Sequence, residues 1–319
     1  MQQTRERVLD ALADGPVSGP ELAERIGVSR AAVWKHVEAL REAGFAITSG
    51  DDGYALESVP EFGGPAVEYG LAAPFEVEYH DEIASTNARA RDLAAEGADD
   101  VVVLADKQTG GRGRLDREWS SPSGGVWLSI CCRPAIPPVQ APALTLAAAV
   151  ATTRAAREAG VDARIKWPND VVVPADGIDE TGKRERKLAG ILTEMEGEAD
   201  RVSWVVVGVG VNANVDPADL PSEADPTSIR AEVGDVNRRV FTQRLLEEFD
   251  ALRGDLEAVI PAWREHAATL GRRVRVDTPG GEVVGEAVDV AFPGTLVVDT
   301  GTERVEVTAG DCEHLRPIE

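Results

Sequence analysis

A long connection between two apolar runs constrains this chain most. Val101–Ala105 and Val126–Cys132 each predict a buried strand, and residues 107–125 between them hold five glycines and three arginines. A connection of this length inside a compact domain is usually functional or disordered. Glycine lets the backbone approach a ligand closely, and arginine presents a charged fork that matches phosphate or carboxylate oxygens. The connection therefore predicts a flexible anion-binding loop, whereas the plainer interpretation is a surface loop with scattered charge.

The acidic composition makes this arginine cluster unusual. The 319 residues include 56 acidic and 33 basic side chains, which gives a net charge of −23, and only five of the basic residues are lysine. Acid excess keeps a protein soluble and says little about its fold. Acid excess with arginine in place of lysine suggests adaptation to a salt-rich cytoplasm, and it makes the few lysines that lie in motifs informative.

Composition also limits the class of protein. The sequence contains no apolar run of 18 or more residues and no signal-peptide pattern, so we expect a soluble cytoplasmic protein without a membrane partner. Cys131, Cys132 and Cys312 have neither zinc-site nor C-x-x-C spacing, which favours reduced core cysteines. The length predicts two or three domains.

Residues 1–58 predict a winged helix-turn-helix. Helical spacing runs over residues 4–13, the capping box Ser18–Glu21 opens a second helix, and Ser29 can cap a third helix over residues 30–43. Two short apolar stretches around an Asp-Asp-Gly turn then predict a β-wing. The side chains expected to reach DNA are Ser29, Arg30, Lys35 and His36.

The charge of this segment leaves an alternative open. Residues 1–58 carry ten acidic and six basic side chains, so their attraction to DNA phosphates is weak. A helical protein–protein module or a dimerisation piece is the competing interpretation.

The remaining chain predicts an α+β protein with a mixed central sheet. Residues 59–74, rich in Pro and Gly, predict a linker, and residues 75–270 predict the large domain. Its helices are expected over residues 86–95, 140–159, 242–259 and 261–268, and its strands over residues 163–166, 171–173, 187–195 and 201–211. Strands joined mostly by short turns favour an α+β arrangement over a doubly wound one. Residues 174–186 and 217–226 predict irregular insertions.

Residues 271–319 change character. Five short apolar stretches separated by Gly/Pro turns predict a small SH3-like β-barrel; they are 274–276, 283–284, 287–290, 296–298 and 305–307. No catalytic group stands out in this segment, so its expected role is to pack against the middle domain.

Four further motifs carry polar chemistry. Ser85-Thr86-Asn87 starts a helix, where hydroxyl, amide and backbone N–H groups converge, although capping alone needs only Ser85. Lys166-Trp167-Pro168-Asn169-Asp170 joins a cation, an aromatic ring and a carboxylate, and Asp170 can hold Mg²⁺ beside phosphates. Lys187 begins one apolar strand, and Asn212 ends another.

Taken together and in this order, the motifs resemble one family. S-T-N, Q-x-x-G-R-G-R, K-W-P-N-D, K-L-A-G-I-L and G-x-G-x-N, with the amino-terminal helix-turn-helix, are similar to the bifunctional biotin–protein ligase/biotin operon repressor family. The resemblance implies that biotin and MgATP form biotinyl-5′-adenylate, and that biotin then passes to a lysine of a biotin-carrier protein. It also implies biotin-dependent binding to operator DNA and allows for a homodimer.

The resemblance assigns expected roles to individual residues. Those implied to contact biotin or its acyl-adenylate are Ser85, Thr86, Asn87, Gln108, Arg112, Gly113, Arg114 and Lys187. Those implied to serve ATP are Arg117, Trp119, Lys166, Asn169, Asp170 and Asn212. Arg114, Lys166 and Lys187 are the expected catalytic residues. Adenylation needs no protein nucleophile, because the carboxylate of biotin attacks the α-phosphate and the enzyme must position two mutually repelling anions.

Two rival functions remain at this point. A lipoate–protein ligase has a similar catalytic fold and acts on a different acid, and a ligand-sensing transcription regulator without ligase activity would keep the helix-turn-helix. The sequence also departs from the usual basic loop of the family, because Asp116 and Glu118 interrupt it. These acids are expected to weaken retention of the adenylate.

Overall fold

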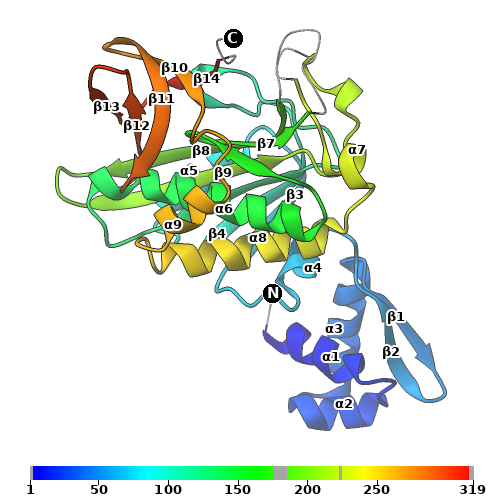
Figure 1. Ribbon diagram of the computed structural model, residues 1–319. Coiled ribbons are helices and arrows are strands. Elements are labelled where there is room, and N and C mark those ends of the chain that lie inside the picture. The colour runs from blue at the N-terminus through cyan, green and yellow to red at the C-terminus, as the bar shows by residue number, and fades with distance from the viewer. Residues whose placement is uncertain (1–2, 176–184, 223–224, 316–319) are drawn as a thin grey trace.

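The computed structural model describes residues 3–175, 185–222 and 225–315. Along the chain it contains an amino-terminal helical unit, a seven-stranded sheet with helices, and a five-stranded sheet near the carboxyl end (Figure 1). The helical unit has an apolar cluster of its own, whereas buried residues of the two sheets belong to one larger cluster.

The amino-terminal unit folds as its capping residues predict. Its elements are α1 (Gln3–Ala13), α2 (Gly19–Ile26), α3 (Arg30–Glu42), β1 (Ala46–Gly50) and β2 (Gly53–Ser58). The Ser18 hydroxyl accepts a hydrogen bond from the Glu21 amide at 3.3 Å, and the Ser29 hydroxyl accepts one from the Ala32 amide at 3.2 Å. β1 and β2 pair antiparallel, which confirms the predicted hairpin.

Residues 59–74, expected to be a linker, include a packed element. α4 (Gly64–Glu68) begins with Pro65 in its first turn, and Ala66 and Val67 are buried. The Gln243 side-chain amide donates to the carbonyl oxygens of Val67 and Tyr69, both at 2.8 Å. The segment is therefore fastened to the central unit rather than free.

The central sheet is mixed, as predicted. Its strands are β3 (Glu76–Ile83), β4 (Val101–Gln108), β5 (Val126–Cys132), β6 (Arg164–Lys166), β7 (Asp170–Pro174), β8 (Glu185–Gly197) and β9 (Val202–Val211). Their order is β3-β4-β5-β9-β8-β7-β6; β3 and β4 run parallel, and the other neighbours pair antiparallel.

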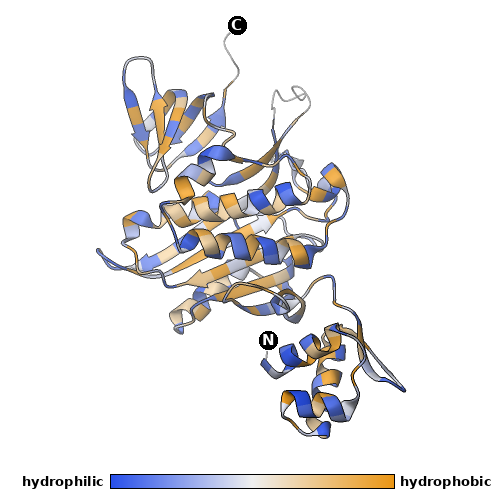
Figure 2. Ribbon diagram, turned by 60° about the horizontal axis from the view of Figure 1, so that its bottom comes forward, coloured by the Kyte–Doolittle hydropathy of each residue, from blue (hydrophilic) through white to orange (hydrophobic). Residues whose placement is uncertain are grey.

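Helices cover both faces of this sheet. Successive side chains on a strand point to opposite sides, and here both sides carry buried apolar residues. α5 (Thr86–Ala95) packs against the face that carries Val103 and Val206. α6 (Pro142–Glu158) covers the other face, and α8 (Arg238–Arg253) and α9 (Val259–Glu265) pack outside it (Figures 1 and 2). Within the described ranges, no helix is both long and apolar enough to cross a membrane.

The carboxy-terminal sheet differs from the prediction in two places. It contains β10 (Arg273–Thr278), β11 (Gly281–Ala291), β12 (Thr295–Asp299), β13 (Arg304–Val307) and β14 (Asp311–His314), in the order β13-β12-β11-β10-β14. Residues 283–284 and 287–290 belong to the single strand β11. Gly285, which lies between them, is inside this strand and not in a turn, and the Asp299 carbonyl of β12 leaves no room for a side chain there. The sequence prediction missed β14, whose residues are mostly polar.

Some boundaries also differ. α8 begins at Arg238 rather than at 242, because the Asn237 side chain caps it by accepting from the Val240 amide at 3.1 Å, and it ends before Gly254. α9 begins at Val259 rather than at 261. Of the predicted insertions, residues 176–184 and 223–224 lie outside the described residues; the part of 217–226 that is described includes a short 3-10 helix, Pro217–Asp219.

One partly buried ion pair joins α8 to the strands beside the long loop. Arg238, whose side chain is 13% exposed, contacts Asp106 at 2.6 Å, the Gly125 carbonyl at 3.2 Å and Glu61 at 3.1 Å. Burial favours the neutral form of Asp106, but the hydrogen bonds from Arg238 and Ser123 keep the pKa of this carboxyl below its usual value. Arg238 therefore holds both ends of the loop to the amino-terminal junction.

We expect Arg238→Ala to lower the free energy of unfolding by roughly 3 kcal/mol, because removing one partner leaves the other charge poorly solvated. Denaturant unfolding measures this. The matched control is Arg230→Ala, which removes an exposed pair with Asp235 and should leave the free energy of unfolding nearly unchanged. Equal losses in the two variants would contradict the importance of the Arg238 contacts.

Candidate functional site

The long loop covers a cavity on the α5 face of the central sheet. The cavity has a volume of about 1500 Å³ and is lined by the first turn of α5, the loop after β4, and parts of β8 and β9. Pockets for one small molecule are usually ~300–1,000 Å³. This cavity therefore has room for two ligands side by side.

Three glycines hollow this face of the sheet. Gly190 pairs with Gly210 across β8 and β9, and Gly208 pairs with Leu192. A Cβ atom on Gly208 would lie 2.0 Å from Asn87 Oδ1, and one on Gly210 would lie 2.5 Å from Nε1 of Trp119. The missing side chains let Asn87 and Trp119 lie directly on the strands.

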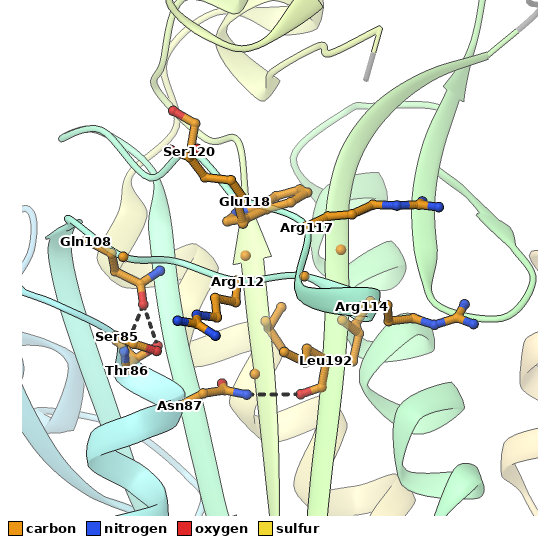
Figure 3. A pocket seen from close by; sticks show the side chains of 18 of the residues that line it. Ser85, Thr86, Asn87, Gln108, Arg112, Arg114, Arg117, Glu118, Ser120 and Leu192 are labelled. Carbon is orange, nitrogen blue, oxygen red and sulfur yellow. Dashed lines mark hydrogen bonds between the residues drawn. The ribbon is translucent and has the colours of Figure 1, made fainter. Parts of the chain in front are cut away.

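The first turn of α5 forms one end of the cavity. Ser85 caps the helix by accepting from the Ala88 amide at 3.3 Å. The Thr86 amide and hydroxyl both donate to Oε1 of Gln108, at 2.8 and 3.1 Å (Figure 3). Asn87 donates to Glu194 at 2.8 Å, and its Oδ1 lies 2.6 Å from Oγ of Ser129. Polar side chains are thus held in fixed positions at the wall.

The loop folds back on itself over the cavity. The Gly113 amide donates to the Arg117 carbonyl at 2.8 Å, and the Trp119 amide donates to the Gly111 carbonyl at 2.9 Å. In Figure 3 the Arg112 side chain extends toward the side of Gln108, whereas those of Arg114 and Arg117 extend the other way. The loop therefore presents cations to both ends of the cavity.

Carboxylates pair with two of these three arginines. Arg112 lies 3.2 Å from Asp116, although both side chains are mostly exposed. Arg117 lies 2.5 Å from Asp311 in β14. Asp116 thus interrupts the basic loop, as its sequence position suggested, and forms an exposed pair of small expected strength.

Arg114 has a different environment. Its guanidinium donates to two neutral oxygens, Oδ1 of Asn169 at 3.0 Å and the Gly310 carbonyl at 2.7 Å. Neutral acceptors fix the orientation of the fork without cancelling its charge. Arg114 is therefore well placed to attract an anion in the cavity.

Lys187 reaches the cavity from β8. Its side chain is 25% exposed, and Nζ lies 2.8 Å from Asp170 and 5.1 Å from the Trp119 ring centroid. Lys187, Asp170 and Trp119 come from three segments that are far apart in the sequence. Their contact places a cation, a carboxylate and an aromatic face at one point of the wall.

The structure gathers most of the predicted ligand-site residues. Those that line the cavity are Ser85, Thr86, Asn87, Gln108, Arg112, Gly113, Arg114, Arg117, Trp119, Asn169, Asp170 and Lys187. Lys166 and Asn212 are not among its lining residues. Asn212 is buried and donates to the Thr227 carbonyl at 2.9 Å, so it ties two segments together behind the wall.

Sequence reasoning missed other residues at the cavity. They include Arg91, Glu194, Gly310 and Asp311, of which all but Gly310 line it directly. Arg91 pairs with Glu194 at 2.7 Å. The helical spacing of Asn87 and Arg91 could have indicated a shared face. Asp311 had no such signal, because its strand was not predicted.

The expected DNA-contacting side chains lie in another part of the chain. Ser29, Arg30 and Lys35 are exposed at the start and on the surface of α3, and His36 is half-buried. Trp34 lies beside them and is 55% exposed, an aromatic group that the sequence interpretation passed over. α3 therefore offers a mixed cationic and aromatic surface.

The donor set at the cavity bears on a possible metal ion. Among the described residues, no group of three or more His, Cys, Asp or Glu side chains is arranged to hold a metal. Mg²⁺ beside phosphates commonly uses only one or two carboxylates, with phosphate oxygens and water as its other ligands. Asp170, which lines the cavity, fits that mode of binding.

Comparison with known proteins places the three parts of the chain. A model of the HTH domain matches residues 4–61, the Biotin/lipoate A/B protein ligase family matches residues 79–212, and the biotin protein ligase C terminal domain matches residues 269–315.

Relatives that match over more than nine-tenths of both chains show the family. The chain is 36% identical to the bifunctional ligase/repressor BirA of Bacillus subtilis over 93% of either chain. It belongs to the bifunctional biotin ligase/repressor family. It is also 33% identical to the protein of the same name from Escherichia coli, covering 92% of this chain and 91% of that one. A shorter relative, the biotin–[acetyl-CoA-carboxylase] ligase of Mycobacterium tuberculosis, is 37% identical over 73% of this chain and 86% of its own length.

A solved structure shares the fold of this biotin ligase/repressor family member. The biotin protein ligase from Aquifex aeolicus in complex with biotin and ATP superposes with a TM-score of 0.61 at 24% identity, covering 76% of this chain and 99% of that chain. At this identity the likeness supports the fold alone.

Proposed function

We propose that the protein is a biotin–protein ligase that activates biotin with MgATP and transfers it to a lysine of a biotin-carrier protein, and that it is also a biotin-dependent transcriptional repressor. One observation supports the ligase function above all. Arg112 and Arg114 come from the loop after β4, Lys187 comes from β8, and all three line one cavity beside the first turn of α5. An otherwise acidic protein thus collects cations where a carboxylate and a triphosphate must meet.

We assign the two ligands to the two ends of the cavity. The residues proposed to contact biotin or its acyl-adenylate are Ser85, Thr86, Asn87, Gln108, Arg112, Gly113, Arg114 and Lys187. The residues proposed to line the ATP site are Arg117, Trp119, Asn169 and Asp170. Lys166 and Asn212 are proposed to serve the ATP side from behind the wall. Lys166 does not line the cavity, so we propose that it affects the reaction only through its charge.

The first step joins the two substrates. A carboxylate oxygen of biotin attacks the α-phosphorus of ATP, the bond between the α-phosphorus and the bridging oxygen breaks, and pyrophosphate leaves. Arg114 and Lys187 hold the carboxylate against the phosphate and screen the charge that builds up between them. Mg²⁺, held by Asp170 and phosphate oxygens, would neutralise charge on the triphosphate.

The second step moves the acyl group to the carrier. The neutral ε-amine of a carrier lysine attacks the acyl carbon of biotinyl-5′-adenylate, the carbon–oxygen bond to phosphate breaks, and AMP leaves as the amide forms and a proton is lost. The adenylate is an activated anhydride that water can hydrolyse. The folded loop from Gly111 to Trp119 covers the cavity and limits the access of water to it.

Further features complete this function. We propose that residues 1–58, 75–270 and 271–319 act as a winged helix-turn-helix domain, a catalytic domain and an SH3-like barrel, joined by residues 59–74. Ser29, Arg30, Lys35 and His36 are proposed to contact operator DNA. The protein is proposed to work in the cytoplasm and to form a homodimer on the operator.

Label transfer tests the ligase function. Purified protein is incubated with a biotin-carrier domain, ATP and Mg²⁺ in high potassium chloride, with either biotin or lipoate, and the carrier is weighed by mass spectrometry. We expect one biotin on each carrier. Transfer of lipoate instead would make the protein a lipoate ligase. No transfer, together with biotin-dependent retardation of its own upstream DNA, would leave a regulator without ligase activity.

Gly208→Ala should lower the affinity for biotin by roughly 10- to 100-fold, because the new Cβ displaces Asn87 and small displacements of positioning groups have effects of this size. Calorimetric titration with biotin measures it. Gly50→Ala is the matched control, since no atom lies within 4 Å of a Cβ placed there. An unchanged dissociation constant for Gly208→Ala would remove Asn87 from the biotin site.

A further inference from the structure

A buried polar cluster lies behind the cavity, where the carboxy-terminal sheet meets the central sheet. It joins Glu185 at the start of β8, His314 in β14, and Thr269 and Arg272 between α9 and β10. The side chains of His314 and Glu185 are 7% and 8% exposed, and Thr269 is fully buried. A buried polar group lowers the stability of the fold unless it has a hydrogen-bond partner, so the contacts within the cluster show how each group is satisfied.

The contacts assign the proton positions on His314. Nδ1 lies 2.9 Å from a carboxylate oxygen of Glu185, so Nδ1 carries the proton and donates. Nε2 lies 3.1 Å from the Thr269 hydroxyl oxygen and therefore accepts its proton. Burial lowers the pKa of His314, which keeps this neutral form. Burial also favours the neutral form of Glu185, but His314, Arg272 and Lys166 hold its pKa below the usual value.

Thr269 connects His314 to the Lys166–Asp170 turn. Its hydroxyl oxygen accepts a hydrogen bond from the Trp167 amide at 2.9 Å. Two residues further on, Asn169 accepts from Arg114 at 3.0 Å and donates to the Ile191 carbonyl at 2.8 Å. A hydroxyl that both donates to an imidazole and accepts from the turn has one fixed rotamer. A shift of the turn away from Thr269 would therefore disturb a hydroxyl that also holds His314.

β14 reaches the cavity by a second route. The Gly310 carbonyl, next to the strand, accepts from Arg114 at 2.7 Å, and Asp311 pairs with Arg117 at 2.5 Å. One short strand thus touches both the arginine loop and, through His314 and Thr269, the turn that carries Asn169 and Asp170. The carboxy-terminal sheet is part of the support of the site and not only a neighbour of it.

We propose that His314 is a positioning residue of the adenylation step: through Thr269 it fixes the Lys166–Asp170 turn so that Asn169 and Asp170 face the triphosphate. This inference rests on the proposed ligase function. It adds a residue outside the family-like motifs, and Thr269 and Glu185 act with it.

Two substitutions at one position separate the two hydrogen bonds of His314. The Asn side-chain amide stands close to where Nδ1 lies, so His314→Asn keeps the bond to Glu185 and loses the partner of Thr269. The Gln side-chain amide reaches the place of Nε2, so His314→Gln keeps the contact to Thr269. Thr269→Val removes the hydroxyl itself. Thr152→Val is the matched control, because Thr152 is equally buried and donates only to the Ala148 carbonyl within α6.

The assay is biotin-dependent exchange of labelled pyrophosphate into ATP, with unfolding midpoints recorded for each variant. His314→Asn and Thr269→Val are expected to lower kcat/KM for ATP by roughly 10- to 100-fold, the size of effect that misplacing a positioning group by about 1 Å has. The affinity for biotin without ATP should change far less. His314→Gln should restore most of the exchange activity, and the His314→Asn/Thr269→Val double variant should be no worse than either single variant.

The outcomes are distinguishable. Equal activity losses in His314→Asn and His314→Gln, or normal kcat/KM for ATP in Thr269→Val, would overturn the positioning role while the ligase function stands. If the unsubstituted protein catalyses no biotin-dependent exchange, the proposed ligase function fails first, and the inference built on it fails with it.

Discussion

Replacing Lys187 with alanine is expected to abolish measurable biotin binding and to slow adenylation by ~10²–10³-fold, the loss typical of removing one preorganised charged donor. Lys187 is three-quarters buried and is held between Asp170 and the Trp119 ring. Its removal takes away a cation and also leaves the Asp170 carboxylate unpaired beside the incoming anions. Calorimetry with biotin and the rate of pyrophosphate release measure the two parts of this effect.

The matched control for this variant is Lys107→Ala. Lys107 also forms an ion pair, with Glu82 at 2.6 Å, but both side chains are about half exposed and Lys107 does not line the cavity. We expect near-normal binding and activity in this variant. A normal biotin titration for Lys187→Ala would contradict its assigned contact with the carboxylate.

Arg114→Ala is expected to produce the second large effect. Its guanidinium is oriented by two neutral oxygens, so its charge is available to the acyl-phosphate link of the adenylate. We expect release of biotinyl-5′-adenylate to accelerate by ~10²-fold or more, in line with the loss of a charge-assisted fork. Stopped-flow release of the preformed adenylate, followed through tryptophan fluorescence, measures the rate constant.

Two variants sharpen this prediction. Arg114→Lys keeps the charge but loses the planar fork that binds two oxygens at once. The adenylate release rate of this variant should therefore lie between that of the unsubstituted protein and that of Arg114→Ala. Arg164→Ala removes an exposed arginine that pairs with Asp162, and it should leave release unchanged. An unaltered rate in Arg114→Ala would remove Arg114 from the adenylate contacts.

The parts of the site that could be predicted are those written in short local patterns. Hydroxyl caps mark the starts of α2, α3 and α5, and apolar runs mark β4, β5 and β9, so the segments bearing the motifs could be placed on their elements. Glycines in the loop indicated close approach. The glycines of β9 were only part of a motif, and the structure shows their role: Asn87 lies on Gly208, and Trp119 lies on Gly210.

The rest depended on tertiary contacts that no local pattern carries. β14 escaped prediction because Asp-Cys-Glu-His has the alternation of a strand with only one apolar side chain, Cys312, to reveal it. Consequently the contributions of Gly310 and Asp311 to the arginine loop were also missed. Motif membership likewise cannot say where a side chain points: Lys166 and Asn212, which the resemblance implied to serve ATP, are not among the residues that line the cavity.

The adenylate formed in a single turnover tests the central claim most directly, namely that one cavity brings a carboxylic acid and ATP together. Purified protein is mixed with biotin and MgATP without a carrier, and the bound small molecule and free pyrophosphate are quantified. We predict about one biotinyl-5′-adenylate and one pyrophosphate per active site, with none formed when biotin is omitted and far less when lipoate replaces it. Pyrophosphate release that is independent of biotin, or no adenylate at all, would contradict the account.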